Sequence, residues 1–381
     1  MNRAGGPIGY FVHHQGRGHA ERAAAIANEL ARDRGVVLFC ARTDIFPELS
    51  SNVEIKQIPS LFEAEAEGGE QIEAELPDTL HCAPLGWSSI SMAVASITGW
   101  FAKADPALFI TDVSAELGQL ARIASVPHIA VLQHGDRNDA GHIASYRGAV
   151  GLLAPYAAEL EQPDRPAWMR ERTIYAPGVG VNCSQIKDRE TARARLGLDP
   201  ELDLVVVVGG GGGTGLPSAP LTLGARAEPA SEWVTLGKIQ TEWHETAPSN
   251  LRHLGWVENP EDWISAADRL VSSCGNTTVH MIAAAGKSWV VVPEWRYFAE
   301  QLRKAEALDA AGAAAMARQW PASAADWQRL WAAASAIDPE NQRALVQRDA
   351  AKTAASEING VIDRIWRKKQ GRPVVVEVAE S

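Results

Sequence analysis

Short apolar runs alternate along this chain with longer, alanine-rich stretches of helical character. Strands of a parallel sheet are covered by helices on both faces, so they are apolar throughout instead of alternating with polar residues. The pattern therefore predicts an α/β protein built on parallel sheets. The apolar runs cover residues 8–12, 36–40, 53–58, 107–111, 128–132, 204–208, 232–236, 268–273 and 288–293.

The alternation pauses at residues 182–203, a polar and charged stretch that is followed at once by a new apolar run. A length of 381 residues allows two domains of ordinary size, each with its own core. We therefore expect one domain over residues 1–185 and a second over residues 186–355. Residues 356–381 are expected to form a final helix that packs back on the first domain, followed by a tail. The apolar positions on one face of that helix are Ile358, Val361, Ile362, Ile365 and Trp366.

Composition and charge exclude several classes of protein. A formal net charge of -11 disfavours sequence-independent binding to nucleic acid, because phosphate backbones are bound by clustered Lys and Arg. The four cysteines show no CxxC spacing, so neither a structural zinc site nor a disulfide framework is indicated. No apolar run approaches the roughly 20 residues that span a bilayer. We expect a cytoplasmic protein, with contact at the inner face of the membrane left open.

A run of glycines follows the apolar run 204–208. Gly209–Gly213, Thr214 and Gly215 would let backbone amides approach a phosphate without obstruction by side chains. The run matches the dinucleotide pattern GxGxxG, but five glycines satisfy that pattern almost by accident and two prolines follow. A flexible turn between strand and helix is the alternative interpretation.

A second turn of small residues follows the apolar run 268–273 and leads into a helical stretch. The amides and the dipole at the start of such a helix favour an anion. After the run 288–293 comes the pair Glu300 and Gln301, which offers acceptors and a donor to sugar hydroxyls. The alternative for this pair is a solvated first turn of the next helix. The residues of the small turn are Ser273, Cys274, Gly275, Asn276 and Thr277.

These segments resemble the donor-binding region of GT-B glycosyltransferases. The resemblance is to the bacterial group that adds N-acetylglucosamine to the peptidoglycan lipid precursor and to the UDP-glycosyltransferases. It implies two Rossmann-like domains whose parallel sheets face each other across a cleft, the first binding the acceptor and the second the nucleotide sugar. The matching motifs follow in the same order along the chain: GRGH at 16–19, ARARLGLDP at 192–200, VVGGGGGTG at 207–215 and LGWVENPEDWISAAD at 254–268.

The resemblance implies an inverting, metal-independent transferase that moves a hexose or N-acetylhexosamine from a UDP-sugar to an acceptor hydroxyl. The UDP-sugar would be a co-substrate; no cofactor is expected, and without an Asp-x-Asp motif we predict no metal site. The acceptor, whether a glycan, a lipid-linked precursor or a small molecule, is left open, as is the oligomeric state. The implied donor ligands are Gly212, Gly213 and Thr214 with Ser273–Thr277 for the diphosphate, Trp256 and Val257 for uracil, and Glu300 and Gln301 for the sugar.

The chain departs from the family pattern at two positions. Ser273 stands where many relatives have a histidine near the diphosphate, and Met281 stands where many have a glutamate that binds the ribose. The first change leaves the backbone amides intact, but the second removes a ribose ligand. Two alternatives therefore stay open: a UDP-sugar hydrolase or epimerase of the same fold, and a catalytically silent protein that binds a sugar nucleotide.

The first loop of the chain, HHQGRGHAER, concentrates titratable chemistry directly after the first apolar run. We predict that His19 is the base that deprotonates the acceptor hydroxyl and that Gly16, Arg17 and Gly18 form the acceptor-side loop. Asp112 ends another apolar run and would orient the ring, a pairing similar to the His-Asp dyad of UDP-glycosyltransferases. The alternative for both residues is a helix cap. His13 and His14 are rivals for His19, but neither has its Gly-His context.

Overall fold

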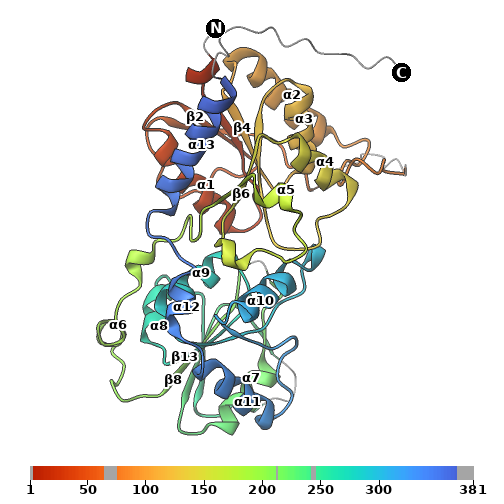
Figure 1. Cartoon of the computed structure of the whole chain (residues 1–381). Helices are drawn as coiled ribbons and strands as arrows, with labels where there is room; N and C mark the ends of the chain where they lie inside the picture. The colour runs from red at the N-terminus through yellow and green to blue at the C-terminus, as the bar shows by residue number, and fades with distance from the viewer. Residues whose placement is uncertain (1–2, 64–74, 212, 242–245, 367–381) are drawn as a thin grey trace.

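The computed structural model describes residues 3–63, 75–211, 213–241 and 246–366. Two parallel-sheet domains, each covered by helices, lie one above the other in Figure 1. The predicted fold class, α/β with two Rossmann-like domains, is therefore confirmed. No helix in these residues is both long enough and apolar enough to cross a bilayer.

The first domain is built on seven strands within the described residues, in the order β3-β2-β1-β4-β5-β6-β7. All neighbouring pairs are parallel. The strands are β1 Ile8–Phe11, β2 Val36–Cys40, β3 Val53–Gln57, β4 Leu108–Asp112, β5 His128–Val131, β6 Gly151–Ala154 and β7 Thr173–Tyr175. The helices are η1 Arg3–Gly5, α1 Arg17–Leu30, α2 Ser88–Ala104, α3 Ala115–Ile123, α4 Ala140–Gly148, η2 Ala158–Leu160, α5 Ala167–Arg170 and η3 Cys183–Gln185.

The second domain has a six-stranded parallel sheet in the described part of the chain, in the order β12-β10-β8-β13-β14-β15, and a short pair β11-β9. Its strands are β8 Leu204–Val208, β9 Leu216–Pro217, β10 Glu232–Leu236, β11 Ile239–Gln240, β12 Leu251–Gly255, β13 Arg269–Ser272, β14 Ser288–Val291 and β15 Ala315–Met316. The helices are α6 Arg189–Leu196, α7 Ser218–Ala227, α8 Pro260–Ala266, α9 Asn276–Ala285, η4 Tyr297–Ala299, α10 Glu300–Ala310, α11 Ala324–Ser335 and α12 Pro339–Arg343.

The strands at the centre of each sheet are buried on both faces, as the continuous apolar runs predict. Every residue of β1, β4 and β8 is buried. The strands β6, β7, β12 and β15 were not among the predicted runs. They are short or polar: β15 has two residues, and β12 exposes Arg252 and His253.

The helix α13, Ala350–Trp366, lies along the first domain although it follows the second in sequence (Figure 1). Ile358, Val361 and Ile362 pack into the core that contains Leu30 of α1. The indole Nε1 of Trp366 donates to the carbonyl of Ala107, at 2.9 Å. Of the predicted apolar face, Ile358, Val361 and Ile362 are buried and Trp366 is partly buried, whereas Ile365 is exposed.

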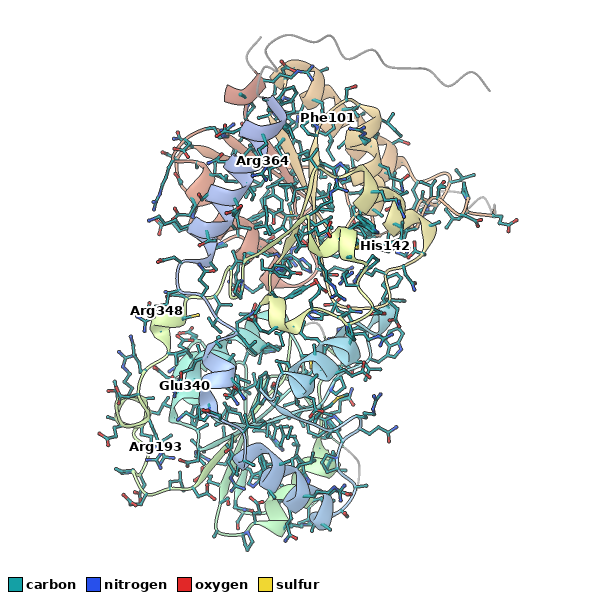
Figure 2. All side chains as sticks on the ribbon, viewed as in Figure 1. Phe101, His142, Arg193, Glu340, Arg348 and Arg364 are labelled. Atoms are coloured by element: carbon teal, nitrogen blue, oxygen red, sulfur yellow. The ribbon has the colours of Figure 1, made fainter. Side chains whose placement is uncertain are left out.

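The polar stretch between the two sheets is held by the second domain. Arg193 of α6, labelled in Figure 2, is buried, and its Nη2 donates to Asp268 Oδ2 at 2.6 Å. Its Nε donates to the carbonyl of Ala266, at 3.0 Å. These contacts tie α6 to the loop before β13. We therefore keep residues 185 and 186 as the proposed boundary.

Candidate active site

Each sheet contains a point where the chain reverses the direction in which strands are added. In the first sheet this point lies between β1 and β4, and in the second between β8 and β13. The loops on either side of such a point diverge, and in open α/β sheets ligands bind there, beyond the carboxyl ends of the strands. The predicted site residues follow these strands: His19 follows β1, Asp112 ends β4, the glycine run follows β8 and Ser273 follows β13.

The first switch point brings His19 and Asp112 together. Gly16, with a φ of 89°, turns the chain out of the β1 loop, so that α1 begins at Arg17. His19 lies in the first turn of α1, and its Nδ1 is 3.2 Å from Asp112 Oδ1. The His19 side chain is 19% exposed, whereas Asp112 is completely buried. A partly accessible imidazole with a buried carboxylate behind it is the geometry of an oriented base.

Arg22, which the sequence reasoning missed, completes this group. Its Nη2 lies 2.8 and 2.6 Å from the two carboxylate oxygens of Asp112 and 2.9 Å from His19 Nδ1. Burial alone would raise the pKa of Asp112, but the Arg22 guanidinium and His19 outweigh it and hold that pKa well below its ordinary value. The carboxylate is therefore ionised at neutral pH. The spacing of three residues, which places Arg22 and His19 on one helix face, was the available signal.

The rival histidines have other partners. The His13 ring stacks on Phe62 with centroids 4.4 Å apart, and its Nδ1 accepts from the Gln15 amide at 3.0 Å. Burial lowers the pKa of His13 to about 3, with the nearby His19 adding to the effect, so this ring is neutral at physiological pH. His14 is buried, and its Nε2 lies 3.1 Å from Glu63 Oε1.

At the second switch point the glycine run lies against the start of α9. A Cβ at Gly210 would be 3.4 Å from Ser273 Oγ. The N-cap residue of α9 is Gly275, and no side chain caps the helix. Ser273 Oγ is buried and has no hydrogen-bond partner among the described residues. The first turn of α9 thus presents backbone amides without a capping acceptor, as an anion site requires.

The loop before His19 lies close to this helix start. A Cβ at Gly18 would be 3.1 Å from Thr277 Oγ1, in the first turn of α9. Arg17 is exposed at the same place. The acceptor-side loop and the predicted phosphate-binding turn, which come from different domains, are therefore neighbours.

The other predicted donor ligands lie around the same strand ends. Trp256 is 67% exposed, and a Cβ at Gly211 would be 3.7 Å from its ring. Val257 is partly buried and packs against a hydrophobic cluster that contains residues of both domains, as does Met281 at the expected ribose position. Thr214 is exposed. Gly212 lies outside the described residues.

An acidic side chain that the sequence reasoning missed lies against Gly213. The Glu294 carboxylate occupies the space into which a Cβ of Gly213 would project, within 2.8 Å. Arg296 Nη2 donates to Glu294 Oε2 at 2.6 Å. Cys274, by contrast, is fully enclosed, and burial raises the pKa of its thiol to about 12. Its thiol is therefore neutral, and its backbone amide donates to Gln301 Oε1 at 3.0 Å.

Glu300 and Gln301 already have protein partners. Glu300 Oε2 accepts from Arg137 Nη2 of the first domain, at 3.1 Å. Gln301 is 5% exposed, and its Oε1 accepts from the amides of Cys274 and Glu294 at 3.0 and 2.9 Å. Gln301 therefore ties the loop after β13 to the loop after β14. Binding of the donor sugar by these two residues stays a prediction.

Replacing Gln301 by Ala should lower the stability of the second domain as well as catalysis. The change leaves the buried amide of Cys274 and the partly buried amide of Glu294 without an acceptor, which costs about 2 kcal/mol. Gln301→Glu keeps an oxygen for both amides and serves as the matched control. Urea unfolding of the two variants measures the difference, and equal stability would show that the bridge contributes nothing.

The residues before Glu300 join the domains through a strained turn. Phe298 and Ala299 have positive φ values of 60° and 52°, which non-glycine residues rarely adopt. The Phe298 carbonyl accepts from the Asp136 amide at 2.7 Å, and the Arg137 guanidinium lies over its ring, 4.6 Å from the centroid. This strain is retained because contacts from both domains determine the turn.

Among the described residues, His81, Asp139 and His142 place candidate metal-ligand atoms within 4.8 Å of one another. His142, labelled in Figure 2, belongs to α4, and its Nδ1 lies 2.6 Å from Asp139 Oδ2. Asp139 also caps α4 by accepting from the His142 amide at 3.1 Å. Helix capping accounts for this pair without a metal, and the cluster is separate from His19 and α9 in sequence and in its contacts.

Comparison with solved structures identifies the fold of the chain. No protein-family model matches the chain, and no curated protein matches it either. Solved structures do match: Acinetobacter baumannii MurG, with 17% identity and a TM-score of 0.57, covers 94% of this chain and 99% of its own. A UDP-glucosyltransferase from Polygonum tinctorium, described as capable of glucosylating indoxyl, has 12% identity and a TM-score of 0.62 and covers 94% and 98%.

A third similar structure is the UDP-GlcNAc 2-epimerase from Neisseria meningitidis bound to UDP-GlcNAc. It shares 10% identity with this chain, has a TM-score of 0.56 and covers 92% of this chain and 99% of its own. Together these structures show that the chain has the GT-B fold over nearly its whole length. The resemblance stated from the sequence motifs is thereby confirmed at the level of the fold.

Proposed function

We propose that this protein is a glycosyltransferase that moves a hexose or an N-acetylhexosamine from a UDP-sugar to an acceptor hydroxyl, with inversion and without a metal ion. One observation carries the proposal. A buried carboxylate holds a partly exposed imidazole at the first switch point, and the loop of that imidazole lies against the uncapped start of α9. A base and an anion site thus meet at the domain interface.

In the proposed reaction the acceptor oxygen attacks the anomeric carbon of the donor sugar. The bond between that carbon and the β-phosphate oxygen breaks, and UDP leaves with the electron pair. His19 Nε2 takes the acceptor proton, and Asp112 stabilises the resulting imidazolium. The α9 amides and dipole stabilise the charge that develops on the diphosphate.

The first domain contains a cavity on the side where the acceptor is proposed to bind. A cavity of about 660 Å³ opens beside the loop that leads to His19. Its lining is mostly polar and includes the ends of β2 and β3. The residues that line it are His14, Gln15, Gly16, Ala41, Arg42, Gln57, Ile58, Pro59, Ser60 and Glu63. Such a lining suits a hydroxyl-bearing acceptor better than a wholly apolar one.

A panel of UDP-sugars tests the proposal against its alternatives. UDP release that depends on an added acceptor supports transfer. Turnover without an added acceptor would favour a UDP-sugar hydrolase or epimerase. The Neisseria epimerase has a similar fold. Binding of a UDP-sugar without turnover would favour a catalytically silent protein that binds a sugar nucleotide. This alternative is tested because Met281 stands where many relatives have a glutamate that binds the ribose. Activity that is lost with EDTA and restored with manganese would contradict metal independence.

Replacing Gly275 by Leu should abolish UDP binding while leaving the fold intact. Gly275 has a φ of -62°, and the nearest atom to an added Cβ is Thr278 Oγ1 at 3.9 Å, so the apo protein tolerates a side chain there. That side chain would occupy the space in front of the α9 amides. We expect UDP affinity to fall by more than about a hundredfold, equivalent to about 2.8 kcal/mol.

Titration calorimetry with UDP measures this effect. Gly99→Leu is the matched control, because a Cβ at Gly99 on α2 meets no atom within 4 Å and its φ is not positive. Unchanged UDP affinity in the Gly275 variant would remove the diphosphate from this position.

A further inference from the structure

Lys304 places a buried positive charge at the start of α9. It lies on α10, is 5% exposed, and its Nζ is 3.3 Å from Oδ1 of Asn276, the first residue of α9. Within the described residues no carboxylate lies within ion-pair distance of Nζ, whereas the neighbouring Glu300 is paired with Arg137. The ammonium is thus satisfied by one amide oxygen only.

The surroundings of Lys304 are poor in negative charge. Burial lowers the pKa of Lys304, and the more distant Glu300 carboxylate only partly opposes this effect. His134 and His280 are electrostatic neighbours of Lys304, and burial lowers the pKa of each, that of His280 to about 4. Both rings are therefore neutral at physiological pH. Within the described residues, no carboxylate other than Glu300 opposes the effect of burial on the pKa of Lys304.

The Lys304 ammonium and the positive end of the α9 dipole therefore lie side by side. The N-terminus of α9 carries the positive end of the helix dipole and has no side-chain cap. A buried ammonium beside it is costly unless an anion binds there. An independent observation points the same way: Ser273 Oγ, three residues before the first residue of α9, is 2% exposed and lacks a hydrogen-bond partner in the described chain.

We propose that Lys304 binds the diphosphate of the nucleotide and stabilises the charge of the leaving UDP, with Ser273 Oγ as a second ligand. The inference rests on the proposed function and adds to it a cationic group that the backbone amides alone do not supply. When the bond between the anomeric carbon and the β-phosphate oxygen breaks, the electron pair stays on the phosphate, and the ammonium lies where it can pair with that charge.

Lys304→Met tests this role, with UDP and uridine as probes. A charged hydrogen bond to phosphate predicts that UDP affinity falls by about ten- to a hundredfold, while uridine affinity stays unchanged. Because the variant removes an unpaired buried charge, the melting temperature of the free protein should stay the same or rise. The stabilisation by saturating UDP should shrink.

Lys287→Met is the matched control. Lys287 is partly buried, and it follows the opposite end of α9, after the C-cap residue Gly286. We expect this variant to keep the UDP affinity of the natural protein. Lys304→Gln, which retains a hydrogen-bonding group toward Asn276, provides the same comparison if the Met variant fails to fold.

The outcomes separate this inference from the function on which it rests. If the natural protein binds UDP and the Lys304 variants bind it equally well, Lys304 is not a phosphate ligand although the proposed function stands. If UDP and uridine affinities fall together, Lys304 acts only through the fold. If the natural protein binds no UDP, both proposals are wrong.

Discussion

His19→Ala should reduce turnover by about a hundredfold or more while leaving UDP affinity nearly unchanged. The imidazole lies on the first domain, where it would meet the acceptor proton, and it is not among the groups expected to bind the donor. Its loss removes the base but none of the α9 amides. Single-turnover assays at saturating UDP-sugar, together with calorimetry for UDP, separate the two effects.

His13→Ala is the matched control for this variant. The two rings are neighbours, with centroids 5.3 Å apart, so a general disturbance of the loop would affect both variants alike. His13 has a pKa of about 3 and uses Nδ1 to accept from a backbone amide, so we expect its loss to reduce turnover less than about tenfold. Near-normal turnover in the His19 variant would remove His19 from the mechanism.

The sequence predicted the central strands well because a parallel strand that is buried on both faces is a continuous apolar run. β2, β8 and β10 have the bounds of the predicted apolar runs. The edge strand β12 is half-exposed and polar, so its sequence is not distinguishable from a loop. β15 has two residues, which are too few to form a recognisable apolar run.

The candidate site was predictable only where residues end adjacent strands. His19 and Asp112 were paired from their positions after two apolar runs, and the strand order β1-β4 places them side by side. Arg22 was missed because its role depends on a carboxylate 90 residues away in sequence. The partner of Glu300 depends further on how two domains sit against each other, which local patterns do not encode.

Arg22→Met should destabilise the protein by about 3–5 kcal/mol at neutral pH. The change leaves the Asp112 carboxylate buried without its guanidinium partner, and breaking a buried ion pair from one side has this typical cost. Both residues are almost completely enclosed, with 3% of Arg22 and none of Asp112 exposed, so solvent cannot replace the lost interaction. Urea unfolding at pH 7 measures the loss.

The double variant Arg22→Met/Asp112→Asn is the decisive control. Removing both charges leaves no unpaired ion, so it should recover much of the stability lost in the single variant. If the double variant is as unstable as the sum of the two single variants, the residues do not act as a pair.

The pH dependence of folding stability, in the natural protein and in Arg22→Met, should follow from the pKa of Asp112. In the natural protein that pKa is held below its ordinary value of 3.8, so the pair stabilises the fold fully above about pH 4 and progressively less as the pH falls further. In Arg22→Met, burial without the guanidinium should raise the pKa of the same carboxyl above its value in the unfolded chain. Protonation then relieves the buried charge, and the folded variant gains stability relative to the unfolded chain as the pH falls. The stability difference between the two proteins should therefore be largest near neutral pH. It should narrow first as the pH falls through the raised pKa of Asp112 in the variant, and further below about pH 4, where the natural protein loses stability. A difference that is constant from pH 7 to pH 3 would show that Arg22 acts through packing and not through the charge of Asp112.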